Sequence, residues 1–239
     1  MGINRTKEVG MKQQNYAVVF DFDGTLADTV EAIREGVNRA LREMGLKERT
    51  YAEVLSFVGN GARELMRRAI GEEKNGDAER IDRALRIYEK HYNECYLMTD
   101  RTYDGVRELV ERLHAEGFAV GVLSNKQDVF VKRLCKQVLT EETYQVAQGV
   151  GEGDPTKPDP HLSNKVAAML GKTADRCIMV GDSDVDVRTA QNAGMEHIGV
   201  TWGFRGEEFL RESGARRLAH TPDELYRLIH EIQDTAERQ

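Results

Sequence analysis

The sequence predicts an α/β fold: a Rossmann-like, doubly wound parallel sheet that carries an inserted α-helical cap. Short apolar runs, the first of which is residues 17–20 (AVVF), recur along the chain and read as buried strands. Segments with helical periodicity lie between these runs, and strands that alternate with helices favour a parallel sheet with right-handed crossovers. Residues 30–100 contain helical patterns only. We therefore expect a helical module to interrupt the sheet after its first strand.

The inserted cap domain is predicted over residues 29–101. Apolar residues recur at spacings of three and four from Val30 to Met44, and Gly45 ends that helix. Thr50 and Glu53 form the pattern of a capping box, which starts a second helix near residue 50. Two more helices are expected over residues 62–70 and 77–96. The α/β core domain then comprises residues 15–28 and 102–239, and residues 1–14 are expected to be a flexible leader.

The core resumes with a helix over residues 104–117, which Gly117 ends. The apolar run 118–123 predicts a second strand, and a helix over 127–138 follows. A Gly/Pro-rich loop covers residues 149–160, and Pro222 opens the last helix. The other elements expected in the core are a weaker strand over 143–147, a helix over 161–170, and strands over 177–180, 197–200 and 216–219.

Composition narrows the possible classes of protein. The net charge of -7 argues against a nucleic-acid surface, which is usually basic. No apolar run approaches the roughly 20 residues that span a bilayer, and the N-terminal segment lacks the apolar core of a signal peptide. Three cysteines without CxxC spacing fit reduced thiols. We expect a cytoplasmic monomer or homodimer that binds neither nucleic acid nor membrane.

Polar clusters follow three of the predicted strands. They are Asp21 with Asp23, Ser124 with Lys126, and Asp182 with Asp186. The carboxyl ends of parallel strands share one edge of a sheet, so these side chains should converge. Carboxylates at one point repel each other unless a cation lies among them, and oxygen ligands suit Mg²⁺. Lys157, in the Gly/Pro-rich loop, adds a positive charge. The combination predicts a site for a doubly charged phosphate ester, so the expected partner is a small phosphorylated metabolite.

Asp21-Phe22-Asp23-Gly24-Thr25-Leu26 resembles the first motif of the haloacid dehalogenase (HAD) superfamily of phosphatases. The resemblance implies that Asp21 is a nucleophile that forms an aspartyl-phosphate. It also implies that Asp23 is the general acid that protonates the leaving alkoxide and then the base that activates water.

The other motifs of that superfamily follow in order. Ser124, with Asn125 beside it, matches the second motif and implies phosphate binding, and Lys157 matches the third. Asp182 and Asp186 match the fourth. The resemblance implies that they bind Mg²⁺ together with Asp21 and the backbone carbonyl of Asp23. Asp184, between the motif acids, is expected to be a helix N-terminal residue.

Residues 57–65 (FVGNGAREL) resemble the cap substrate loop of the phosphoglycolate phosphatase-like branch, and residues 124–126 and 200–204 match that subgroup as well. This implies hydrolysis of 2-phosphoglycolate to glycolate and phosphate. Helix N-termini favour anions, so the loop is expected to hold the substrate carboxylate and to exclude water when it closes. The residues expected to contact the substrate there are Gly59, Asn60, Gly61, Arg63 and Lys126.

Three alternatives stay open from the sequence. The chain could hydrolyse another small phosphate, such as a sugar phosphate, a nucleotide or pyrophosphate. It could be a phosphomutase of the β-phosphoglucomutase type, which shares the four motifs. It could also be a non-catalytic binding protein, although both Asp21 and Asp23 are present. Residues 149–155 are richer in glycine than the family pattern, which leaves the shape of that loop open.

Overall fold

The computed structural model describes residues 14–237, with side chains to residue 235, and its core is a six-stranded parallel sheet. The strand order is β3-β2-β1-β4-β5-β6, and every neighbouring pair is parallel. The predicted fold class is therefore confirmed. The strands are β1 (Ala17–Phe20), β2 (Ala119–Gln127), β3 (Val146–Val150), β4 (Cys177–Gly181), β5 (Glu196–Val200) and β6 (Leu218–Ala219).

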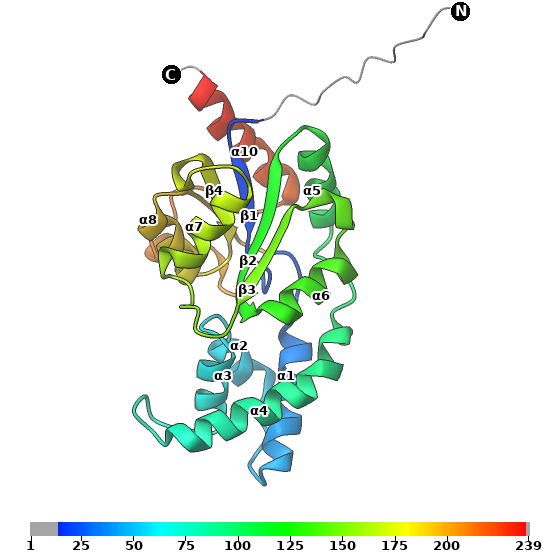
Figure 1. Ribbon diagram of the computed structural model, residues 1–239, viewed down its shortest axis with the longest axis vertical. Coiled ribbons are helices and arrows are strands. Elements are labelled where there is room, and N and C mark those ends of the chain that lie inside the picture. Colours follow the sequence, from blue (N-terminus) through cyan, green and yellow to red (C-terminus); the bar gives the residue numbers. More distant parts are fainter. Residues whose placement is uncertain (1–13, 238–239) are drawn as a thin grey trace, which may run out of the picture.

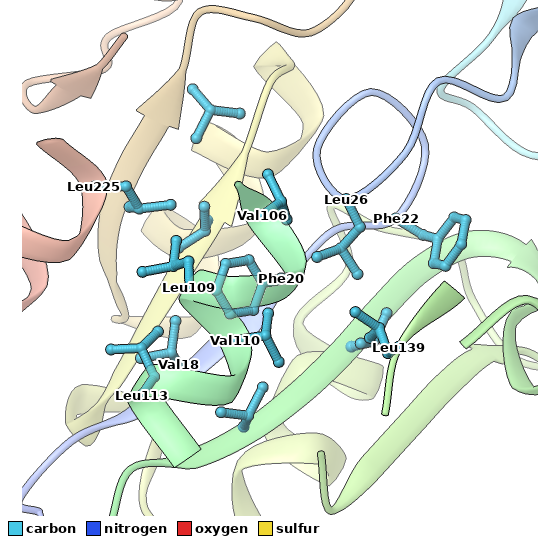
Figure 2. Packing of buried hydrophobic residues seen from close by; sticks show 14 of the residues in the cluster. Val18, Phe20, Phe22, Leu26, Val106, Leu109, Val110, Leu113, Leu139 and Leu225 are labelled. Carbon is cyan, nitrogen blue, oxygen red and sulfur yellow. The ribbon is translucent and has the colours of Figure 1, made fainter. Parts of the chain in front are cut away.

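Helices cover both faces of the sheet (Figure 1). β1 shows how its side chains divide, because alternate residues of a strand point to opposite faces. Val18 and Phe20 pack on α5 and α10, as Figure 2 shows, whereas Ala17 and Val19 pack on α7 and α8. The core helices are α5 (Val106–Ala115), α6 (Asp128–Val138), α7 (Pro160–Met169), α8 (Asp184–Ala193), α9 (Gly206–Glu212) and α10 (Pro222–Glu237), with short 3₁₀ turns η2 (Glu141–Thr143) and η3 (Ala174–Arg176).

The segment between β1 and α5 is helical throughout and lies beyond one end of the sheet (Figure 1). It consists of α1 (Val30–Glu43), α2 (Tyr51–Phe57), α3 (Ala62–Ala69), α4 (Ala78–Cys95) and the 3₁₀ turn η1 (Tyr96–Met98). The capping box is confirmed, since Thr50 Oγ1 accepts from Glu53 N at 3.3 Å and Glu53 Oε2 accepts from Thr50 N at 2.8 Å. These helices enclose a hydrophobic cluster of their own, to which Phe130 of α6 also belongs. The domain boundaries near residues 28 and 101 stay predictions.

Three strands differ from the expected ranges by more than one residue. β2 does not stop at Leu123 but continues through Ser124 to Gln127, with an irregular register against β3. Backbone pairing with β3 continues past the apolar run, so the change from apolar to polar residues does not coincide with the end of the strand. β3 begins at Val146 rather than residue 143, because Thr143 ends the η2 turn. β6 is shorter than predicted.

The predicted leader lies outside the described residues except for residue 14. Gln14 donates from its side chain to the Glu116 carbonyl at 2.7 Å and from its backbone to the Gly117 carbonyl at 3.3 Å. Gln14 is thus attached to the core. Among the described helices, none combines the length and the apolarity needed to cross a membrane.

Candidate active site

Three buried carboxylates meet at the carboxyl edge of the sheet. Asp21 directly follows β1, Asp182 directly follows β4, and Asp186 lies in the first turn of α8. One carboxylate oxygen of each lies within 4.8 Å of the others. β1 and β4 are neighbours in the sheet, which is why residues 160 positions apart in the chain come together. The convergence expected from the strand order is present, and we call these three residues the acid cluster.

Lys157 is the cation of the acid cluster. Its Nζ lies 2.9 Å from Asp21 Oδ1 and 2.8 Å from Asp186 Oδ1, and it donates to the Leu123 carbonyl at 3.1 Å. Burial lowers the pKa of Lys157, but Asp186 and Asp21 together outweigh burial and raise it above its ordinary value. The lysine is therefore charged at neutral pH.

One lysine does not neutralise three acids. The pKa of Asp21 is raised to about 7, chiefly by burial, with Asp186 and Asp23 also raising it and Lys157 lowering it. Burial likewise raises the pKa of Asp182 well above its usual range, with smaller contributions from Asp186 and Asp21. The acid cluster thus holds excess negative charge that a bound cation would relieve.

Glycines let the backbone approach the acid cluster closely. Gly24 has φ +85°, and a Cβ there would lie 2.4 Å from Asp182 Oδ2. A Cβ on Gly203 would lie 2.2 Å from the Gly24 carbonyl. The loop after β5 therefore packs directly on the first motif, and Asp182 Oδ2 accepts from Phe204 N at 2.7 Å. Only glycine fits at either position without moving the carboxylate.

The donor set of the acid cluster fits a hard divalent cation. All its ligand atoms are carboxylate oxygens, which suit Mg²⁺ better than soft metals. Both oxygens of Asp186 have partners, since Oδ1 pairs with Lys157 and Oδ2 accepts from Ser183 Oγ at 2.6 Å. Both oxygens of Asp182 accept as well, from Thr25 Oγ1 at 3.3 Å and from Phe204 N at 2.7 Å. Asp21, which pairs with Lys157 through Oδ1, is consequently the best-placed first ligand. Asp186 also positions the lysine.

Asp23 lies beside the acid cluster and has two donors of its own. Lys126 Nζ is 3.1 Å from Asp23 Oδ1, and Thr29 Oγ1 donates to the same oxygen at 2.6 Å. Lys126 Nζ also donates to the hydroxyl of Tyr92 in α4 at 3.0 Å. Sequence reasoning missed Thr29 and Tyr92. Thr29 is the N-cap residue of α1, but its side chain makes no capping hydrogen bond, and its hydroxyl donates to Asp23 instead.

The side chain of Asn125 forms its hydrogen bonds within the protein. Its Oδ1 accepts from Lys157 N at 2.7 Å, and its Nδ2 donates to the Lys157 carbonyl at 3.1 Å and to the Gly59 carbonyl at 2.9 Å. A primary amide has two N–H donors, and both are engaged. The Asn125 side chain therefore joins the Lys157 loop to the helical insert, and phosphate binding by residue 125 stays a prediction. Ser124 lines the cavity, and its Oγ accepts from Lys126 N at 3.3 Å.

A cavity of about 60 Å³ lies over Asp21 and Asp23, between the sheet edge and the helical insert. Its far wall is mostly apolar and aromatic. Tyr88 and Tyr92 are stacked with centroids 5.2 Å apart, and Phe130 packs edge-on against Tyr92 at 4.9 Å. The remaining apolar residues that line the cavity are Ile33, Val58, Ala62, Leu65, Val185 and Phe204. The space admits a small molecule only.

Two of the residues predicted to contact the substrate lie outside the wall of the cavity. Gly59 and Gly61 line the cavity, but Asn60 and Arg63 are exposed and are not part of its wall. The phase of α3 explains this, since Ala62 and Leu65 face inward and Arg63 points outward to Asp82, 3.0 Å away. Arg205, which sequence reasoning missed, lines the cavity instead. Arg205 directly follows residues 200–204, which match the phosphoglycolate phosphatase-like subgroup. Nothing else in the sequence indicates that this loop arginine lines a cavity.

The fold and the cavity together define a class of protein: an α/β enzyme in which acidic and cationic side chains meet beneath a helical insert. Comparison with known proteins supplies the family. The model of the haloacid dehalogenase-like hydrolase family matches residues 18–200, and the chain belongs to that family. It is a phosphoric monoester hydrolase, as its curated relatives also indicate.

Two relatives and one solved structure illustrate the similarity. A phosphoglycolate phosphatase of Aliivibrio fischeri is 31% identical over 82% of this chain and 88% of its own length. One from Pseudomonas fluorescens (strain Pf0-1) is 32% identical over 92% of this chain and 80% of its own. A crystal structure described as a predicted phosphatase from Clostridium acetobutylicum is 27% identical, has a TM-score of 0.80, and covers 92% of this chain and 100% of its own.

Proposed function

We propose that this phosphatase is Mg²⁺-dependent, works through an aspartyl-phosphate on Asp21, and hydrolyses 2-phosphoglycolate to glycolate and phosphate. The observation that carries the proposal is the small cavity, of about 60 Å³, directly over Asp21 and Asp23. So small a space favours a small ester over a hexose phosphate or a nucleotide. The names of the relatives point to the same substrate.

Asp21 is the nucleophile in this proposal. Its carboxylate oxygen forms a bond to phosphorus while the ester P–O bond breaks, and the leaving alkoxide takes a proton from Asp23. Water then attacks the phosphorus of the aspartyl-phosphate and gives a proton to Asp23. The bond between phosphorus and the Asp21 oxygen breaks, so phosphate and the free Asp21 carboxylate are formed. Thr29 and Lys126 hold the Asp23 carboxyl at 2.6 and 3.1 Å, and this fixes the position from which it transfers the proton.

Lys157 and Ser124 bind phosphoryl oxygens in the proposal. Mg²⁺ would be held by Asp21, Asp182 and the backbone carbonyl of Asp23, with Asp186 close by, and would supply positive charge to the phosphoryl group. Residues 29–101 act as a cap domain over the core of residues 15–28 and 102–239, and we expect the enzyme to work in the cytoplasm.

The test measures phosphate release from 2-phosphoglycolate beside hexose phosphates, nucleotides and pyrophosphate, with Mg²⁺ and with EDTA. Asp21→Asn is the key variant. Asp184→Asn is its matched control, because Asp184 lies between the motif acids yet pairs with Arg188 outside the cavity. Metal-dependent release that favours phosphoglycolate and is lost only in Asp21→Asn supports the proposal.

Other outcomes would correct particular parts of it. Preference for another ester overturns the substrate and keeps the chemistry. Release that EDTA does not reduce contradicts the metal requirement. Interconversion of hexose phosphates without phosphate release would replace the hydrolase with a mutase.

A further inference from the structure

Three cationic side chains line the cavity among the described residues, and two of them are neutralised by acids. Lys157 pairs with Asp21 and Asp186, and Lys126 pairs with Asp23 at 3.1 Å. Arg205 differs, because it forms no ion pair with any described residue. Its Nη2 donates to the Val58 carbonyl at 2.9 Å, and its guanidinium lies 5.9 Å from the Phe209 ring centroid. Arg205 thus supplies the unpaired positive charge of the cavity.

A second source of positive potential lies on the same side of the cavity. α3 begins at Ala62, its N-cap is Gly61 with φ +83°, and no side chain caps it. Gly61 and Ala62 both line the cavity. The first N–H groups of a helix have no partner within the helix and carry part of the positive end of its dipole. Arg205 is bonded to the loop that leads into this helix, so the two features act on one place.

The core holds this loop at two successive carbonyls. Arg205 donates to the Val58 carbonyl, and Asn125 donates to the Gly59 carbonyl, both at 2.9 Å. Asn125 is in turn bonded to the backbone of Lys157, beside the acid cluster. The position of residues 58–61 is therefore set from the core. A guanidinium has five N–H donors, and the single bond to Val58 leaves most of them for a ligand.

We propose that Arg205 and the N-terminus of α3 form a second anion subsite, which binds the carboxylate of a small phosphomonoester while Lys157 and Ser124 bind its phosphate. The inference rests on the proposed function and deepens it. Arg205 is the specificity-determining residue for esters that carry a second negative charge close to the phosphate. An arginine suits this task, because its planar fork binds a carboxylate through two parallel hydrogen bonds.

The test compares two esters that differ only in that charge: 2-phosphoglycolate and 2-hydroxyethyl phosphate. In Arg205→Gln, we expect kcat/KM for phosphoglycolate to fall by about 100-fold, the size typical of losing one partner of a desolvated charge pair. For the neutral ester we expect a change of less than about threefold, because only the Val58 bond is disturbed. Arg205→Lys should recover part of the loss, since it restores charge without the fork. Arg211→Gln removes an exposed arginine of α9 that pairs with Glu207, and it should change neither ester.

Equal losses with both esters would overturn the proposal, because Arg205 would then serve only to hold the loop. The absence of any loss with phosphoglycolate in Arg205→Gln would overturn it as well. Calorimetric binding of phosphoglycolate to Asp21→Asn, with and without Arg205→Gln, separates this inference from the proposed chemistry. Binding that weakens with Arg205→Gln supports the subsite even where turnover of phosphoglycolate fails, and equal binding contradicts it.

Discussion

The two walls of the cavity are built on different principles. On the sheet side, the acid cluster and Lys157 are buried, their ion pairs are 2.8 to 2.9 Å long, and the backbone is packed so closely that only glycine fits at residues 24 and 203. On the helical side, aromatic and aliphatic side chains predominate, and residues 58–61 are held through two backbone carbonyls.

This difference separates reaction from recognition. Buried charges need a fixed arrangement, because an unpaired charge in the interior costs several kcal/mol. The sheet-side wall therefore admits almost no substitution. Backbone carbonyls accept hydrogen bonds whatever side chains surround them, so the helical wall can change its side chains while the loop stays in place. Changes on the sheet side should abolish the reaction, and changes on the helical side should alter which ester is hydrolysed.

The largest expected effect is on the nucleophile. Asp21→Asn should lower kcat by roughly 10⁴-fold or more, as removal of a catalytic nucleophile does in other hydrolases. The substitution is isosteric and removes one of several crowded negative charges, so the thermal midpoint should stay within about 4 °C. Phosphate release and thermal unfolding measure the two effects. A residual activity within tenfold of the unmodified enzyme would exclude Asp21 as nucleophile.

Removal of the buried cation should affect stability most. Lys157→Met leaves Asp21 and Asp186 buried without their partner, and we expect the free energy of unfolding to fall by about 3–5 kcal/mol. Urea unfolding in EDTA measures this loss. Lys132→Met, which breaks an exposed pair with Asp128, is the control. Mg²⁺ should restore part of the stability of Lys157→Met, and an equal loss in both variants would contradict the role assigned to Lys157.

Stability should depend on pH through Asp21. Its pKa is raised from 3.8 to about 7, chiefly by burial, so between these values the folded protein holds a proton that the unfolded chain has lost. The folded state thus binds more protons, and stability falls as the pH rises from about 4 to about 7. The raised pKa of Asp182 acts in the same direction.

Urea unfolding in EDTA across this pH range, compared between the unmodified chain and Asp21→Asn, isolates the contribution of Asp21. The decline should be shallower in the variant. Saturating Mg²⁺ should flatten it in the unmodified chain, because metal ligands must be ionised. Identical slopes in the two proteins would show that Asp21 is ionised throughout. Glu64, whose pKa is lowered to about 2 by Arg67, affects stability only at lower pH, where its carboxylate takes up a proton.

A smaller effect is expected where the two walls touch. Tyr92→Phe removes the hydroxyl that accepts from Lys126 at 3.0 Å but keeps the ring that packs on Phe130. The loss of one such bond corresponds to roughly a tenfold decrease in kcat/KM, with Asp23 less firmly positioned. Tyr96→Phe, whose ring also packs on Phe130, is the control. A shift in the pH profile of kcat in Tyr92→Phe alone would support positioning of Asp23, and no change would show that Lys126 does not depend on Tyr92.

The smallest expected effect concerns Arg63. It distinguishes the sequence prediction that Arg63 contacts the substrate from its exposed position beside Asp82 in the structure. Arg63→Gln should change kcat/KM for phosphoglycolate by less than about twofold, because an exposed ion pair such as Arg63–Asp82 contributes little. Arg205→Gln in the same assay provides the contrast. A large loss in Arg63→Gln would restore the expectation that Arg63 reaches the substrate.

The sheet, the helical insert and the meeting of Asp21, Asp182 and Lys157 could be predicted from the sequence. Parallel strands end at one edge of the sheet, so the residues that follow them come together. Packing does not require paired acids after an apolar strand, so such a pair indicates a functional site. Local signals also located the capping box at Thr50 and the glycines of residues 59 and 61. These features depend on residues close together in the chain.

Which side chains face the cavity is determined by the tertiary structure. Arg63 and Arg205 are both arginines near recognised segments, yet the rotation of α3 turns Arg63 to Asp82, while the loop after β5 brings Arg205 to Val58. The amide of Asn125 is used by Lys157 and Gly59, which lie 32 and 66 positions away. Such choices depend on the packing of segments far apart in the chain, and periodicity within one segment carries no information about them.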